Sequence, residues 1–115
     1  MRVWGLANCD KCRAARRWLD EQGIDHDFVD VRDDLPSAER IERWLEVLGP
    51  HDLVNRRSRT WRELDEEQRA KLESPDVVDL LRANPTLIKR PLFEEPHGQV
   101  RVGFDDEVRT WLSSR

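Results

Sequence analysis

The only two cysteines of the chain lie close together, in the sequence Cys9-Asp10-Lys11-Cys12. Two intervening residues is the spacing of redox-active dithiols, in which one thiolate attacks and the second thiol can resolve the product. The pair falls where a short strand expected over residues 2–6 gives way to a helix expected from about residue 10 to residue 23. A cysteine at a helix start faces unpaired N–H groups and the positive end of the helix dipole, which favour thiolate. We therefore predict that Cys9 is a nucleophile.

Basic side chains surround the pair, at Lys11, Arg13, Arg16 and Arg17. Nearby cations lower the pKa of a thiol. The chemistry that this favours is attack by Cys9 on a disulfide sulfur or an oxyanion centre. Cys12, one helical turn further on, is placed to resolve the intermediate. The alternatives are an inert buried cysteine at position 9 and a passive core residue at position 12.

A zinc site is the chemical rival of a redox pair, because two cysteines at this spacing supply half of a tetrahedral site. The remaining ligands would have to come from His26, His51 and His97, which are scattered singly along the chain. We therefore expect no metal and no bound cofactor.

Composition limits the class of protein. The 115 residues fit one domain, and a net charge of −4 with a pI near 5.4 lacks the positive charge of a nucleic-acid-binding protein. The sequence contains no apolar run long enough to span a membrane and no signal-peptide core. We expect a cytoplasmic monomer, and in the cytoplasm a cysteine pair more often serves redox or metal chemistry than a structural disulfide.

The remaining elements follow from apolar spacing and turn residues. A second strand is expected over residues 27–31, and a helix from about residue 37 ends at Gly49. Residues 60–63 have the form of a capping box opening a helical region through residue 72, and Ser74-Pro75 predicts the start of another helix. Two strands joined at Pro96-His97-Gly98 and a closing helix complete the chain.

This order is β-α-β, a helical block, then β-β-α. With a cysteine at the first strand-to-helix turn, it resembles the α/β thioredoxin-like fold with an inserted helical subdomain. We expect a single domain over residues 1–115, with a core of about 1–35 and 86–115 and an insert of about 36–85. Pro91 would then begin the third strand, and in this fold a cis proline faces the active cysteine.

Three segments carry a more specific resemblance. They are NCDKCRAARRWL at 8–19, NRRSRTWREL at 55–64 and LIKRPL at 87–92. Together they resemble the family of glutaredoxin-coupled, ArsC-type arsenate reductases, YffB-like reductases and Spx transcription regulators. The similarity covers essentially the whole chain, and the YffB-like reductases fit best.

The resemblance implies roles for individual residues. Cys9 matches the nucleophile, and Pro91 matches the cis proline. The positions that match substrate- or oxyanion-binding arginines are Arg13, Arg57 and Arg90. The family's third oxyanion arginine falls where this chain has Gly103-Phe104, which makes arsenate a doubtful native substrate. Cys12 is a second departure, because arsenate reductases of this type usually lack it whereas Spx proteins have the pair.

The implied function is a thiol-dependent oxidoreductase. Its expected co-substrate is glutathione, with Cys12 as the alternative resolving thiol, and glutaredoxin or thioredoxin are possible recycling partners. The alternative is a Spx-type redox-sensing regulator that binds the RNA polymerase α-subunit. The sequence ends directly after its last expected helix, without the extension typical of Spx proteins, and this favours the reductase.

Overall fold

The structure is a computed structural model that describes all residues 1–115, and the chain divides into two compact units. One unit joins Met1–Asp30 to Arg90–Arg115, and the other comprises Val31–Lys89. The predicted core, about 1–35 and 86–115, is therefore a few residues longer at each junction than the first unit of the structure. Ile88 and Lys89 belong with the helices because both contact the end of α3 (Pro50–Leu53). The Lys89 N–H donates to Leu53 O at 2.8 Å, and Ile88 pairs with Val54 in a β-bridge.

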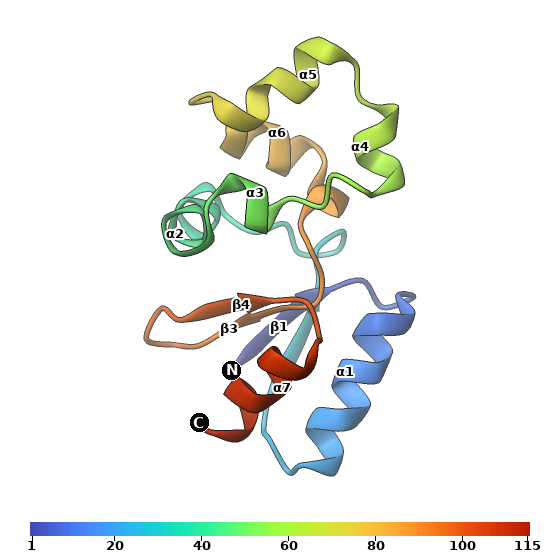
Figure 1. The fold of residues 1–115 in the computed structure, drawn as a ribbon, viewed down its shortest axis with the longest axis vertical. Coiled ribbons are helices and arrows are strands. Elements are labelled where there is room, and N and C mark those ends of the chain that lie inside the picture. The colour runs from blue at the N-terminus through green and yellow to red at the C-terminus, as the bar shows by residue number, and fades with distance from the viewer. The chain divides into compact units, whose positions relative to one another are not determined.

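The first unit is a four-stranded sheet with two helices. Its elements are β1 (Arg2–Gly5), α1 (Asp10–Glu21), β2 (Asp27–Asp30), β3 (Leu92–Glu94), β4 (Val100–Val102) and α7 (Asp106–Ser113). The sheet order is β2-β1-β3-β4, with β1 and β2 parallel and the other pairs antiparallel (Figure 1). The predicted order of β-α-β followed by β-β-α is confirmed. Strand β1 ends at Gly5, one residue before the predicted end.

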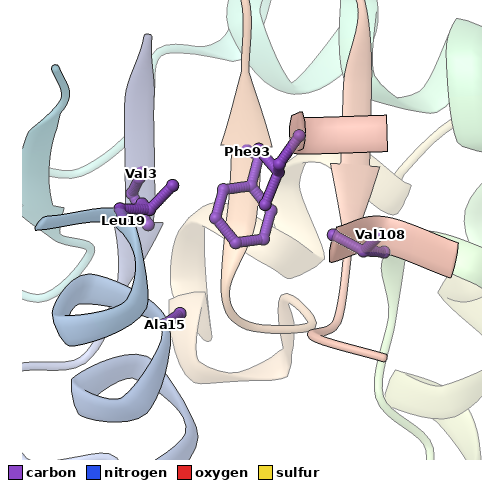
Figure 2. Close-up of a cluster of buried hydrophobic side chains, with 6 residues drawn as sticks. Val3, Ala15, Leu19, Phe93 and Val108 are labelled. Carbon is purple, nitrogen blue, oxygen red and sulfur yellow. The ribbon is translucent and has the colours of Figure 1, made fainter. Parts of the chain in front are cut away.

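Both helices of this unit pack against one face of the sheet. Val3 and Phe93 are direct neighbours in the β1–β3 register, so their side chains point to the same face. Ala15 and Leu19 from α1 and Val108 from α7 join them in one buried cluster (Figure 2). Because Cys12, Ala15 and Leu19 lie three and four residues apart on α1, the core-facing stripe that buries this helix also buries the second cysteine.

The second unit is helical. It contains α2 (Ala38–Leu48), α3 (Pro50–Leu53), α4 (Arg59–Glu63), α5 (Glu66–Ala70) and α6 (Val77–Ala83), with 3₁₀ turns at Lys71–Glu73 and Pro85–Leu87. Its core is built from Ile41, Trp44, Leu53, Val54, Leu72, Leu80, Leu81, Leu87 and Ile88, all buried. No helix in either unit is long and apolar enough to cross a membrane.

Several local details of this unit differ from the prediction. Gly49 ends α2 as expected, but Pro50 at once begins the unpredicted short helix α3. The residues proposed as a capping box lie inside or at the end of α4. The cap is Ser58, whose Oγ accepts a hydrogen bond from Trp61 N at 3.1 Å, and the helical region breaks at Leu64.

The start of α6 also differs from the prediction. Ser74 does not cap the helix. Its Oγ accepts from Asp76 N at 3.1 Å within the preceding turn, and α6 begins at Val77. Its fully buried residues are Leu80 and Leu81, whereas Val77 and Val78, predicted to face inward with Leu81, are half-buried.

Candidate functional site

Cys9 lies at the N-cap of α1. Its backbone is extended, with φ −92° and ψ 125°, and its carbonyl accepts the first helical hydrogen bond from Arg13 N at 2.9 Å. On the other side its N–H donates to Leu6 O at 3.2 Å, which closes a tight turn after β1. The side chain is half-buried. Cys9 therefore lies at the helix start, as the sequence predicted, and is not fully buried.

The environment of the Cys9 sulfur favours the thiolate. Burial by itself would raise the pKa of Cys9, but interactions with the Cys12 and Lys11 backbone N–H groups, the Cys12 thiol and the Arg90 side chain outweigh it and lower the pKa below its ordinary value of 9.0. Cys9 Sγ makes no side-chain capping hydrogen bond to the helix. The lowered pKa thus comes from several groups together rather than from one cap.

Cys12 is the opposite case. It has no exposed surface, and burial is the main cause that raises its pKa to about 11, reinforced by the hydrogen bond and charge of Cys9. A backbone hydrogen bond from Leu6 and the charge of Arg90 offset this only in part. Of the two thiols, Cys9 therefore ionises more readily and Cys12 is held in its neutral form, and both cysteines are free rather than joined in a disulfide.

Two residues that shape this turn were absent from the predicted site. Asp30, at the end of β2, is buried, and its Oδ2 accepts from Ala7 N at 2.9 Å, which anchors the segment between β1 and Cys9. Gly5 pairs with Asp30 in the sheet register and lies against the Cys12 sulfur. A glycine at the end of an apolar strand often marks a close approach, and this was the available signal for Gly5. No sequence signal distinguished Asp30 from the other acids.

Arg90 and Pro91 belong to the same unit as Cys9. The Arg90–Pro91 peptide bond is cis, as predicted, and Pro91 is buried with its carbonyl accepting from Gly103 N at 2.9 Å. The Arg90 side chain hydrogen-bonds to the Cys9 sulfur and is the cation that acts on both cysteines. The structure therefore brings Cys9, Cys12 and Arg90 together.

The other two predicted arginines have different surroundings. Arg13 forms an ion pair with Asp10 on the exposed side of α1, and it is not among the groups that hydrogen-bond to Cys9. Arg57 lies in the helical unit, exposed in the turn before α4, with its N–H donating to Asn55 Oδ1 at 3.0 Å. A role for Arg57 at the cysteine site stays a prediction.

The histidines weighed as zinc ligands have other partners or lie apart. His51 pairs with Glu73 at 2.8 Å in the helical unit, and His26 Nδ1 lies 2.9 Å from Ile24 O. No group of three or more histidine, cysteine, aspartate or glutamate side chains lies close enough to hold a metal ion. The arrangement at Cys9 is suited to nucleophilic attack by a thiolate beside a guanidinium that can bind an anionic group.

Comparison with known proteins agrees with this architecture. A sequence model of the ArsC family matches residues 4–110. A solved YffB protein is 34% identical with a TM-score of 0.87 and 96% of each chain covered. An arsenate reductase (ArsC) related protein from Brucella melitensis is 33% identical with a TM-score of 0.75, covering 96% of this chain and 91% of that one. The global transcriptional regulator Spx of Streptococcus pyogenes is 29% identical over 92% of this chain and 80% of its own length. The predicted thioredoxin-like α/β fold is confirmed.

Proposed function

The chain belongs to the ArsC family, and from this premise we propose that it is a thiol-dependent reductase with the Cys9 thiolate as its nucleophile. The observation that carries the proposal is the convergence of donors on one half-buried sulfur: two backbone N–H groups, the Cys12 thiol and the Arg90 side chain. Thiolates with such donors and a lowered pKa are the reactive form in thiol–disulfide exchange.

The first step is attack of Cys9 on a sulfur of a disulfide substrate. A bond forms between Cys9 Sγ and that sulfur, the substrate S–S bond breaks, and the second substrate sulfur leaves as a thiolate. The mixed disulfide holds the oxidising equivalents. Arg90 can pair with an anionic group of the substrate by forked hydrogen bonds, and it can stabilise Cys9 as thiolate again when the disulfide is resolved.

A second thiol completes the turnover. Glutathione thiolate can attack the substrate sulfur of the mixed disulfide, which releases Cys9 as thiolate and forms a glutathione–substrate disulfide. Alternatively, Cys12 loses its proton and attacks Cys9 Sγ, which releases the reduced substrate and leaves a Cys9–Cys12 disulfide for glutaredoxin or thioredoxin to reduce. The proposal places the reaction in the cytoplasm, where glutathione keeps thiols reduced.

Disulfides suit the site better than arsenate does. The resemblance places the family's third oxyanion arginine where this chain has Gly103-Phe104. Phe104 packs in the first unit with its ring centroid 5.7 Å from that of Trp18, and Arg109 stacks over it at 4.3 Å. This position is therefore an apolar contact rather than an anion ligand, so we propose arsenate only as a side substrate.

A redox-sensing regulator is the second candidate, and one observation favours it. The resemblance to Spx proteins implies a cysteine pair at the matching position, and this chain has both Cys9 and Cys12 and is similar to Spx along most of its length. In that case oxidation of the pair would control binding to the RNA polymerase α-subunit.

One panel of proteins separates the two functions. Wild type, Cys9→Ser and Cys12→Ser are assayed for reduction of a glutathione mixed disulfide and of arsenate, with glutathione alone and with glutaredoxin, and for binding to the purified α-subunit. We expect turnover in the wild type and a loss of at least about a thousandfold in Cys9→Ser, because a serine hydroxyl is not ionised at neutral pH.

The Cys12→Ser result assigns the resolving thiol. Activity retained with glutathione means that glutathione resolves the mixed disulfide, and activity lost together with accumulation of that adduct means that Cys12 does. Absence of turnover with every donor, combined with tight α-subunit binding that depends on the oxidation state of the pair, would replace the reductase by the regulator.

A further inference from the structure

Gly5 is the one glycine of this chain whose place is not explained by its backbone. The chain has five glycines, and the other four, Gly23, Gly49, Gly98 and Gly103, all have positive φ values that disfavour residues with a Cβ. Gly5 lies at the end of β1 in ordinary extended conformation. Glycine weakens a strand, because it loses more conformational freedom on folding and has no side chain to pack. The presence of glycine at position 5 must therefore have a reason other than its backbone dihedral angles.

The space beside Gly5 is filled by the second cysteine. A Cβ at position 5 would lie 2.5 Å from Cys12 Sγ and 3.5 Å from Cys12 Cβ. The first distance is well below van der Waals contact, so the sulfur would have to move. A Cβ at any of the other four glycines would meet nothing within 4 Å. The missing side chain at Gly5 is therefore matched specifically to the Cys12 sulfur.

Several contacts restrict where that sulfur could go. Cys12 has no exposed surface and sits on the stripe of α1 that packs into the core with Ala15 and Leu19. Leu6, the residue after Gly5, donates a backbone hydrogen bond to it. The Phe28 ring is 3.3 Å from the Cβ position of residue 5 and carries the Arg16 guanidinium at 4.2 Å from its centroid. A sulfur displaced from Gly5 would thus have to move within the buried interior, because Cys12 has no exposed surface.

We propose that Gly5 is a positioning residue for the reaction at Cys9, because it leaves the space in which Cys12 Sγ is held and from which the Cys12 thiol donates its hydrogen bond to the Cys9 sulfur. The role of Gly5 in catalysis rests on Cys9 being the nucleophile of the proposed reductase, whereas its effect on Cys9 ionisation does not. Cys12 then acts on Cys9 in every turnover, whether or not it also resolves the mixed disulfide.

The experiment measures the ionisation of Cys9 directly. Fully reduced wild type, Gly5→Ala, Cys12→Ala and the Gly5→Ala/Cys12→Ala double variant are alkylated with iodoacetamide across a pH series, and the Cys9 peptide is quantified by mass spectrometry. We expect Gly5→Ala and Cys12→Ala each to raise the pH midpoint of Cys9 alkylation by about one unit, as the loss of one hydrogen bond to a charged sulfur predicts. The double variant should match Cys12→Ala, since without the sulfur the added methyl meets only the Phe28 ring at 3.3 Å and the Cβ of residue 12 at 3.5 Å.

Gly23→Ala is the control. Its positive φ of 68° strains alanine, but no atom lies within 4 Å of the added Cβ, so it destabilises the same unit without touching the pair. Its Cys9 midpoint should equal that of the wild type. A folded Gly5→Ala protein with a wild-type midpoint, or a double variant shifted well beyond Cys12→Ala, would show the proposal to be wrong.

Failure of Gly5→Ala to fold is also informative. The double variant, which lacks the clashing sulfur, should then recover the far-ultraviolet circular dichroism of the wild type, and if it does not, the space at Gly5 does not serve Cys12. The alkylation assay uses no substrate and no reductant partner. A shifted midpoint in a protein without reductase turnover would therefore refute the proposed function and leave the role of Gly5 intact.

Discussion

At the scale of single residues, the two cysteines differ because one helical turn separates two environments. Cys9 lies at the helix start, where backbone donors, Cys12 and Arg90 lower the pKa of its thiol despite partial burial. Cys12 lies on the core-facing stripe, where burial raises the pKa of its thiol to about 11. The same spacing that brings the sulfurs within reach therefore shifts their pKa values in opposite directions.

The arginines at the site should differ in the same way. Replacing Arg90 by Gln removes a hydrogen bond and a positive charge from the Cys9 sulfur, so the pH midpoint of Cys9 alkylation should rise by about one unit. Arg13→Gln is the matched control, because Arg13 is engaged by Asp10 on the exposed helix face, and its effect should stay within about 0.3 unit. Equal shifts in both variants would mean that general positive charge, rather than Arg90 itself, stabilises the thiolate.

At the scale of elements, α1 begins without the side-chain cap that four of the other helices have, as α3 and α6 also do. Four helices are capped by a side-chain oxygen that accepts from the N–H three residues on: Ser37 from Arg40, Ser58 from Trp61, Asp65 from Gln68 and Asp105 from Val108. Cys9 has the extended backbone of a capping residue but makes no side-chain cap. Helix α1 therefore gives up part of the stability of a capped helix and keeps its free N–H groups for the thiolate.

This comparison predicts that the inactive variant Cys9→Ser is more stable than Cys9→Ala. The serine hydroxyl can accept from the N–H groups of Lys11 and Cys12 as the other caps do, whereas alanine leaves them without a side-chain partner. The free energy of unfolding should differ by about 1 kcal/mol in favour of serine, measured by urea denaturation at neutral pH. Equal stability of the two variants would show that the turn at Cys9 cannot accommodate a capping hydroxyl.

At the scale of the whole molecule, the reactive pair is part of what folds the first unit. Cys12 is buried beside the strand β1, and Ala15 and Leu19 continue its stripe into the core around Phe93. A neutral Cys12 is a good core residue, but its thiolate is not. The ionisation of one site residue is therefore coupled to the stability of the fold.

The coupling has a definite sign at alkaline pH. Because the folded pKa of Cys12 is raised to about 11 from an ordinary 9.0, its neutral form stabilises the fold below pH 9, and this stability is lost as the pH rises towards 11. Urea denaturation of reduced protein between about pH 8 and pH 11 should show a decline that is clearly smaller in Cys12→Ala. The chain has no tyrosine that would titrate in this window.

Two features make this measurement specific to Cys12. The lowered pKa of Cys9 acts in the opposite direction and at lower pH, since its contribution is present above pH 9 and is lost as the pH falls through the folded pKa. All other ionisable groups are the same in wild type and variant. An identical alkaline decline in both proteins would mean that the Cys12 thiol is not held in its neutral form by the fold.

Much of this protein was determined by local sequence. The apolar stripes of α1 and α2, the position of Cys9 after a short strand, and the order of strands and helices followed from residue type and spacing, because they depend on neighbours within one or two helical turns. Boundaries that depend on competing local hydrogen bonds were less secure. Ser58 caps α4 in place of the predicted capping box, and Pro50 begins a helix directly after a stop signal.

The relation between the cysteines was decided by the tertiary structure. Spacing alone predicted that the two sulfurs lie within reach of each other. It did not predict that Cys12 is held neutral in the core beside Gly5. Nor did it predict that the donors around Cys9 include Arg90, eighty-one residues further along the chain. Likewise, the anchoring of Ala7 by Asp30 requires β2 to lie beside β1. Burial, close approach and contact with a distant charge are properties of packing, and they act on the pKa of each thiol together with its neighbours in sequence.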